Sequence, residues 1–178
     1  MNKKDAWIRT YTGGKVFFFE PEKSTFEIED VAHALSLCCR FNGATNIFYS
    51  IAQHCCVICD ELPEHLKFTG LMHDASEFCL SDIPKPFKAA IDGYEEAERR
   101  FEEFLSKKFG FEYPYPTIIK DFDKKMLATE MRDYMNVNDA KLINVNYLYP
   151  KKKKIDAWTW ERSKREFLNR YYKYRNYE

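Results

Sequence analysis

Apolar side chains recur every three or four positions along most of the chain, which predicts helices with one buried face. The pattern is regular in the first helix, where the apolar positions are Ile28, Val31, Leu35 and Cys38. We expect Ser24 or Thr25 to cap this helix and Asn42-Gly43 to end it. The other predicted helices cover about residues 48–62, 64–79, 87–109, 117–135 and 156–172, the last capped by Asp156.

The N-terminal residues follow a different pattern. Thr12-Gly13-Gly14-Lys15 is typical of a turn, and the four residues after it have the composition of a strand, so a short hairpin is expected within residues 7–19. The sequence thus predicts an all-α bundle with a small N-terminal β-hairpin. We expect one domain, 1–178, made of the hairpin (1–22), a helical core (23–136) and a C-terminal helix (150–174).

Composition narrows the classes of partner. The chain has 178 residues with 28 basic and 28 acidic side chains, so its formal net charge is zero. A neutral chain has no general attraction for nucleic acid or for an anionic membrane, and we expect neither as a partner. The basic run Lys151–Lys154 is interpreted as a solvated loop before the last helix.

Cysteine usage indicates the compartment. The six cysteines form no two Cys-x-x-Cys pairs of the kind that bind structural zinc, and adjacent cysteines on apolar helices are typical of buried free thiols. The start of the chain lacks an apolar signal segment, and no apolar run approaches the roughly 18 residues of a membrane span. These features predict a cytoplasmic protein.

Histidine is scarce, and one histidine is followed directly by an acid. His73 and Asp74 are adjacent, and on a helix their side chains point about 100° apart, so both can reach one ion at the helix edge. Glu77 lies on the same helix face. It would place a carboxylate that does not bind the ion where it can transfer a proton.

Two further ligands are expected from other helices. His54 lies within an amphipathic helix, and Asp123 lies in a helix near apolar positions, where a carboxylate is costly unless it is paired or bound. This nitrogen and oxygen set suits one divalent ion of Co, Mn, Fe or Zn. His33 either lines the same pocket or is a buried structural residue. Glu130 either orients a ligand or is solvated.

Several short stretches resemble a known family. They are Cys39-Arg40-Phe41, Ala52-Gln53-His54, His73-Asp74-Ala75-Ser76-Glu77, and Asp82-Ile83-Pro84 followed by Pro86 and Lys88. Together with Asp123 they resemble the H…HD…D signature of HD-domain metal-dependent phosphohydrolases, and most of all the bacterial 5′-deoxynucleotidases and their phage relatives. The resemblance spans about residues 27–135. This chain departs from the pattern at Gln53, where relatives commonly have Glu, and at Phe41, where they often have Trp.

The resemblance implies an HD-domain bundle that hydrolyses deoxynucleoside 5′-monophosphates to nucleoside and phosphate. The implied metal ligands are His54, His73, Asp74 and Asp123. Glu77 would be the general acid or base, and Asp82 would orient that site or the sugar. Arg40 would bind phosphate, with Lys88 as a weaker candidate, and Phe41 would pack on the nucleoside.

Other functions stay open at this point. The same metal site could release triphosphate from a deoxynucleoside triphosphate, with Lys85, Lys88 and Lys120 supplying charge for the longer tail. Cleavage of a cyclic dinucleotide or of guanosine tetraphosphate is a third enzymatic option. A non-catalytic nucleotide-binding module is the alternative of another class. Related proteins are often oligomers, which makes a homo-oligomer an open possibility.

Overall fold

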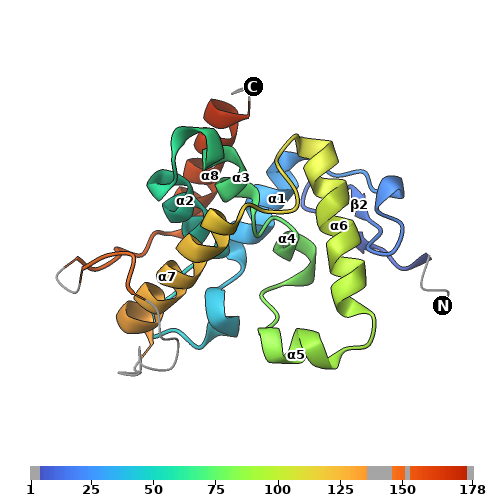
Figure 1. The fold of residues 1–178 in the computed structure, drawn as a ribbon. Helices are drawn as coiled ribbons and strands as arrows, with labels where there is room; N and C mark the ends of the chain where they lie inside the picture. The colour runs from blue at the N-terminus through green and yellow to red at the C-terminus, as the bar shows by residue number, and fades with distance from the viewer. Residues whose placement is uncertain (1–4, 136–145, 151–152, 176–178) are drawn as a thin grey trace.

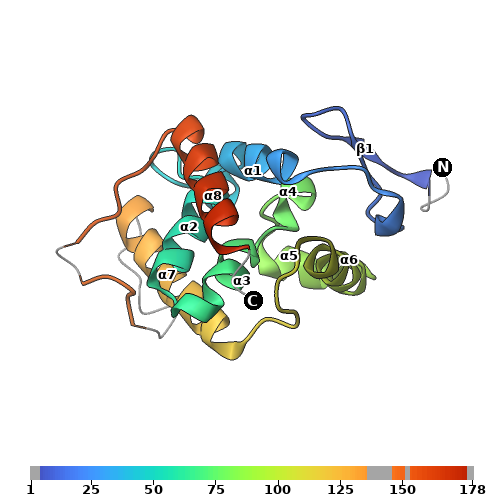
Figure 2. The same ribbon diagram turned by 90° about the horizontal axis from the view of Figure 1, so that it is seen from above.

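Helices packed around α2 form the larger part of the structure, a computed structural model that describes residues 5–135, 146–150 and 153–175. Helix α2 contacts α1, α3, α7 and α8, and α4 joins this group to the pair α5 and α6 (Figures 1 and 2). The bounds are α1 Ile28–Leu37, α2 Ile51–Glu61, α3 Lys67–Met72, α4 Glu77–Leu80, α5 Lys85–Ala90, α6 Tyr94–Phe109, α7 Thr117–Tyr134 and α8 Trp160–Tyr174. The predicted helical class is confirmed. Within the described residues, no helix is both long and apolar enough to cross a membrane.

The predicted hairpin is present and is shorter than expected. Strands β1 (Ile8–Arg9) and β2 (Lys15–Val16) pair antiparallel. Gly14 is required in the turn, because a Cβ there would lie 1.8 Å from a backbone oxygen of the following segment. The buried carboxylate of Asp30 accepts hydrogen bonds from the Thr12 backbone N–H and hydroxyl at 2.7 and 2.9 Å. These bonds fasten the hairpin to the start of α1.

Three predicted helix ends were wrong. Helix α1 is capped by Glu27, which forms a reciprocal capping box with Asp30, because Thr25 instead pairs with the hairpin. It ends at Leu37, since the next residues turn extended and Cys39 bridges to Ser50. Helix α8 is capped by Thr159, not Asp156. In each case a tertiary contact or a nearer cap overrides the sequence pattern.

Two predicted long helices are broken. The first becomes a 3-10 turn η4 (Glu64–Leu66), α3 and α4, and residues 73–76 between α3 and α4 are held by tighter i to i−3 bonds. The second breaks at residues 91–93, where Gly93 adopts a left-handed conformation with φ of 75°. The first break carries His73 and Asp74, and the second separates α5 from α6. Both breaks shape the site described below.

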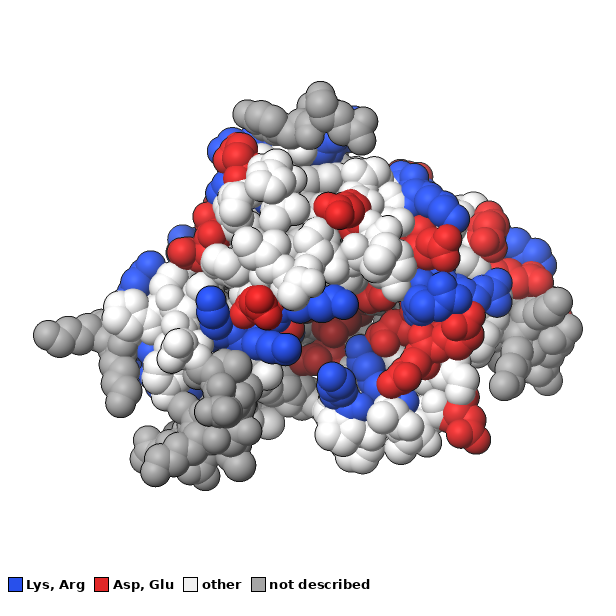
Figure 3. All heavy atoms as spheres, in the orientation of Figure 1, with Lys and Arg blue, Asp and Glu red and all other residues white. Residues whose placement is uncertain are grey.

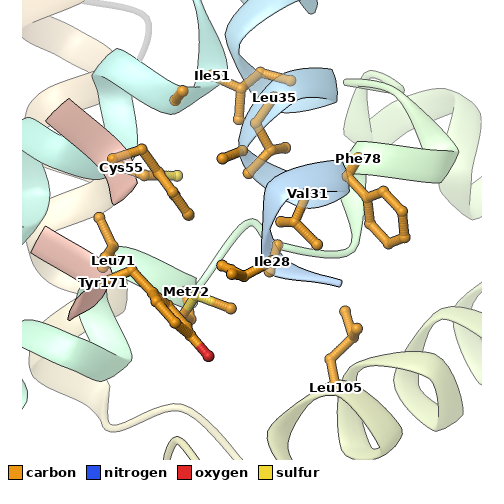
Figure 4. Close-up of a cluster of buried hydrophobic side chains, with 14 of the residues drawn as sticks. Ile28, Val31, Leu35, Ile51, Cys55, Leu71, Met72, Phe78, Leu105 and Tyr171 are labelled. Carbon is orange, nitrogen blue, oxygen red and sulfur yellow. The ribbon is translucent and has the colours of Figure 1, made fainter. Parts of the chain in front are cut away.

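The core lies where α1, α2, α3, α4, α6 and α8 meet. It is lined by aliphatic, aromatic and thiol side chains, most of them without exposed surface, and Figure 4 shows how they converge from these helices. The labelled members are Ile28, Val31, Leu35, Ile51, Cys55, Leu71, Met72, Phe78, Leu105 and Tyr171. A second cluster around Tyr49, Ile58 and Met126 packs α7 against α2. Burial of these faces fixes α2 as the central element on which the site is built.

Gln53 ties α2 to the segment that leads into α8. Its amide nitrogen donates to the Asp156 carbonyl at 2.7 Å, and its amide oxygen accepts from the Trp158 backbone N–H at 2.8 Å. The Gln53 side chain is almost fully buried, and both bonds are part-buried. Gln53, one of the two positions at which this chain departs from the HD-domain pattern, therefore has a structural role. Its amide is suited to this role because it can donate one hydrogen bond and accept another.

We expect Gln53→Ala to lower the free energy of unfolding by about 1–3 kcal/mol, because it removes two part-buried hydrogen bonds. Urea denaturation of the variant and of the parent protein measures this loss. Glu22→Ala, at an exposed position, is the control and should change stability by less than about 0.5 kcal/mol. A loss as small as that in Gln53→Ala would show that the two hydrogen bonds do not anchor α8.

Candidate metal centre

Three separate elements bring the predicted ligands to one point. His54 comes from the middle of α2, His73 and Asp74 come from the tight turn between α3 and α4, and Asp123 comes from the first half of α7. His54, His73 and Asp123 form a group whose ligand atoms all lie within 4.8 Å of one another. The packing of α3 and α7 against α2 is what assembles them.

The ligand atoms face one another across short gaps. The Nε2 atoms of His54 and His73 are 3.3 Å apart. The Oδ2 atom of Asp74 lies 3.5 Å from His54 Nε2 and 3.3 Å from His73 Nε2. The Oδ1 atom of Asp123 lies 3.2 Å from His54 Nε2. His54, His73 and Asp123 thus face one centre, and Asp74 lies beside it, close to both imidazoles.

These separations match the edges of a coordination polyhedron. Two ligands that each lie about 2.05 Å from an ion, at a tetrahedral angle, are roughly 3.3 Å apart. Two neutral imidazoles and two carboxylates are also a donor set that first-row divalent ions accept. The residues present therefore fit one divalent ion in size and in chemistry.

Hydrogen bonds at the far side of each imidazole fix which nitrogen faces the centre. Glu130 has no exposed surface, and its Oε1 accepts from His54 Nδ1 at 2.6 Å. The Gly70 carbonyl accepts from His73 Nδ1 at 2.8 Å. Because both acceptors require a proton on Nδ1, Nε2 is the nitrogen of each ring that can bind an ion once its own proton is lost.

Arg40 links Glu130 to Asp74, one of the two candidate carboxylate ligands. Its guanidinium donates to Glu130 Oε2 at 3.1 Å and to Asp74 Oδ2 at 3.3 Å, and the side chain is only 8% exposed. Arg40 follows α1 in the 3-10 turn η3 (Arg40–Gly43), so its side chain projects from a bend of the chain. The buried positive charge of Arg40 offsets part of the negative charge of Glu130, Asp74 and Asp123.

The charges shift the pKa values of the group in different directions. Burial and the Arg40 charge lower the pKa of His54, but Glu130 and Asp123 outweigh them and raise it to about 10. Burial raises the pKa of Asp123, yet His54, His73 and Arg40 hold it well below its usual range. Without an ion, protons therefore occupy the imidazole, and an ion has to displace them to bind.

A cleft of about 780 Å³ opens beside the centre. Asp74 and Asp123 line it, with Glu77, Arg40 and Phe41 around them. Figure 3 shows acidic side chains at the bottom of a hollow in the middle of this face, with Lys and Arg side chains at its edge. A cleft of this size accommodates a small organic ligand. Its side chains include every predicted site residue except His54 and His73, which lie behind it.

Glu77 is the one carboxylate of the cleft wall that is almost fully buried. It is 6% exposed, and its Oε2 has no hydrogen-bond partner. Burial raises the pKa of Glu77 well above its ordinary value, and the negative charges of Asp74 and Asp82 raise it further. A carboxyl group in this state can give a proton to a group bound in the cleft.

Asp82 fixes the loop that carries Phe41. Its Oδ2 accepts the Phe41 backbone N–H at 2.7 Å across 41 positions of sequence. Phe41 has a φ of 56° and Asn42 a φ of 51°, a left-handed conformation that non-glycine residues rarely adopt. The bond to Asp82 is one of the contacts that hold this strained turn, which places the Phe41 ring in the cleft.

The opposite wall of the cleft comes from α5 and α6. Lys88 donates to Glu98 at 2.7 Å, and Glu95 and Glu102 follow the same face of α6. Burial and the neighbouring Glu98 raise the pKa of Glu102 to about 7. This wall is therefore acidic, with Lys88 as its paired cation.

Sequence reasoning left two residues undecided. Glu130 is the fully buried partner of His54, so the solvated alternative was wrong and the orienting one holds. His33 stacks on Tyr11 with ring centroids 3.7 Å apart and lines a separate cavity of about 300 Å³ by the hairpin, so it does not belong to the cleft. In the run Lys151–Lys154, the first two residues lie outside the described residues.

Comparison with known proteins identifies relatives at the level of sequence. No protein-family profile matches the chain. Over 129 residues it is 38% identical to the uncharacterized protein YfdR of Escherichia coli K12, an alignment that covers 72% of each chain. Over 128 residues it is 35% identical to an uncharacterized protein of Rhodobacter capsulatus, covering 66% of this chain and 65% of that relative. Neither protein's name states an activity.

Proposed function

This chain belongs to the family of the Escherichia coli protein YfdR, and we propose that it is an HD-type, metal-dependent phosphohydrolase that converts deoxynucleoside 5′-monophosphates to nucleoside and phosphate. The observation that carries the proposal is the convergence of His54, His73, Asp74 and Asp123, with separations of 3.2–3.5 Å between neighbouring ligand atoms, on a cleft. The deoxynucleoside part of the proposal comes from the resemblance in sequence.

The ligand set explains how the reaction starts. When bound, a divalent ion activates water near neutral pH and offsets negative charge on a phosphoryl group. His54, His73, Asp74 and Asp123 would hold it, and the two aspartates line the cleft. In the proposed hydrolysis a water oxygen bonds to phosphorus, and the bond from phosphorus to the 5′-oxygen breaks.

Glu77 is the residue that we assign to proton transfer. Its side chain lines the cleft three residues after Asp74, and its buried carboxyl has an oxygen without a partner. A protonated carboxyl in this position would deliver its proton to the departing 5′-oxygen, which leaves as the nucleoside hydroxyl. A proton-transfer role explains why a carboxyl that makes no ion pair is buried here at the cost of its solvation.

Arg40 and Phe41 are the proposed contacts to the nucleotide. Both line the cleft beside Asp74, with the guanidinium carbon 5.4 Å from the centre of the Phe41 ring. Arg40 brings a fixed positive charge for phosphate, and the ring offers an apolar face for the nucleoside. Because Glu130 and Asp74 already hold the guanidinium, little conformational freedom would be lost on binding.

The charge of the cleft lining bears on the length of the phosphate chain. Glu95, Glu98 and Glu102 line the wall formed by α6, where Lys88 is already paired with Glu98, and Lys85 and Lys120 also line the cleft. A triphosphate carries about two more negative charges than a monophosphate, and it would have to place them near the two lysines and away from the α6 carboxylates. The preference for a monophosphate in this proposal therefore comes from the resemblance in sequence, and product analysis decides between the two substrates.

We expect the purified protein to release orthophosphate from deoxynucleoside 5′-monophosphates in the presence of Mn²⁺ or Co²⁺, and a chelator to abolish turnover. Product analysis over mono-, di- and triphosphates is the measurement. His73→Ala should lose ion binding and turnover together. Release of inorganic triphosphate would replace this function by triphosphohydrolysis, and nucleotide binding without any turnover would indicate a binding module.

We expect Glu77→Gln to bind the divalent ion and the nucleotide normally while kcat falls roughly 10²-fold or more, the usual scale of a lost proton transfer. Glutamine keeps the size of the side chain but cannot donate the acid proton. Steady-state kinetics with ion-binding titration measure both properties. The control is Glu112→Gln, an exposed position that does not line the cleft, which should leave both unchanged. Normal kcat in Glu77→Gln would remove this residue from the chemistry.

A further inference from the structure

A buried thiol lies beside the candidate metal centre. Cys55 follows His54 on α2 and has no exposed surface. Its sulfur, a ring nitrogen of His73 and a carboxylate oxygen of Asp74 all lie within 4.8 Å of one another. Cys55 is a free cysteine. The centre therefore has a potential sulfur ligand that the proposed reaction does not use.

Two candidate coordination sets overlap at His73. One adds His54 and Asp123, and the other adds Cys55 and Asp74. The sets differ in depth, because the Asp123 side chain is 39% exposed at the cleft whereas Cys55 belongs to the hydrophobic core. An ion that moves from the first set to the second loses Asp123, gains the sulfur of a core residue and keeps one cleft carboxylate, Asp74.

The two sets also differ in chemistry. Nitrogen and oxygen ligands suit harder ions such as Mn²⁺, whereas a thiolate selects softer ions such as Zn²⁺ and, beyond it, Cd²⁺. A thiol binds such an ion as the thiolate, so the S–H bond breaks, the sulfur–metal bond forms and the proton leaves to solvent. No oxidant or reductant takes part.

We propose that Cys55, His73 and Asp74 form a second coordination set that captures thiophilic divalent ions and holds them on the core side of the centre. This inference rests on the metal centre of the proposed function. An ion held by Cys55 is bound without Asp123 but occupies His73 and Asp74, so Zn²⁺ or Cd²⁺ in excess inhibits an enzyme that works with Mn²⁺.

The decisive experiment titrates the metal-free, full-length protein with Cd²⁺ and records the ultraviolet charge-transfer band of a thiolate–cadmium bond. We expect the band in the parent protein and in Cys56→Ser, and its loss in Cys55→Ser. Cys56 is the matched control because it is equally buried on the same helix yet belongs to neither ligand group. Cys55→Ala, checked by its melting temperature, replaces the serine variant if that variant fails to fold.

Affinities separate this inference from the proposed function. Loss of a hydrogen-bond partner behind a metal ligand weakens metal affinity roughly 10- to 100-fold. Cys55→Ser removes a ligand itself, so its Cd²⁺ affinity should fall by more than this, while its Mn²⁺ affinity stays unchanged. Stoichiometric Cd²⁺ binding without the band, or a band that survives in Cys55→Ser, overturns the inference. Failure of Mn²⁺ to bind the parent protein overturns the proposed function instead, because the cadmium band does not depend on Asp123.

Discussion

The buried carboxylate of Glu130 is the constraint on which the site depends. It accepts from His54 at 2.6 Å and from Arg40 at 3.1 Å, with no access to water. A buried charge is tolerated only when hydrogen-bond or ion-pair partners replace its solvation. His54 and Arg40 are the partners of Glu130, and Glu130 in turn is a partner of each of them. The bond to His54 sets the imidazole so that Nε2 faces the ligand centre, and Arg40 carries the connection on to Asp74.

The fold supports this arrangement through the position of α2. His54 projects from α2 toward the cleft side, while Gln53, one residue earlier, is bonded to the segment before α8, and Cys55, one residue later, enters the core. Three consecutive side chains thus have three different roles: Gln53 anchors the segment before α8, His54 belongs to the candidate metal centre, and Cys55 packs in the core. Because α2 packs against α1, α3, α7 and α8, the ligand positions are fixed by the same contacts that stabilise the molecule.

Much of this could be predicted from the sequence, and the misses have physical causes. Periodicity predicted the helices, and residue type with spacing predicted that His54, His73, Asp74 and Asp123 lie together. The break at residues 73–76 was missed, because its tight hydrogen bonding is not visible in residue spacing. The bond from Phe41 to Asp82 spans 41 positions, and the burial of Glu130 depends on how α7 packs, so neither could be derived from a local pattern.

The measurement that tests this account most directly is the affinity of Glu130→Gln for Mn²⁺, determined by calorimetric titration of the metal-free protein beside its melting curve. An amide keeps the shape of the side chain but carries no charge to orient His54 or to hold Arg40. The account predicts a folded protein whose Mn²⁺ affinity is roughly 10- to 100-fold weaker, the cost of losing a hydrogen-bond partner behind a metal ligand. Unchanged affinity in a folded variant would contradict it.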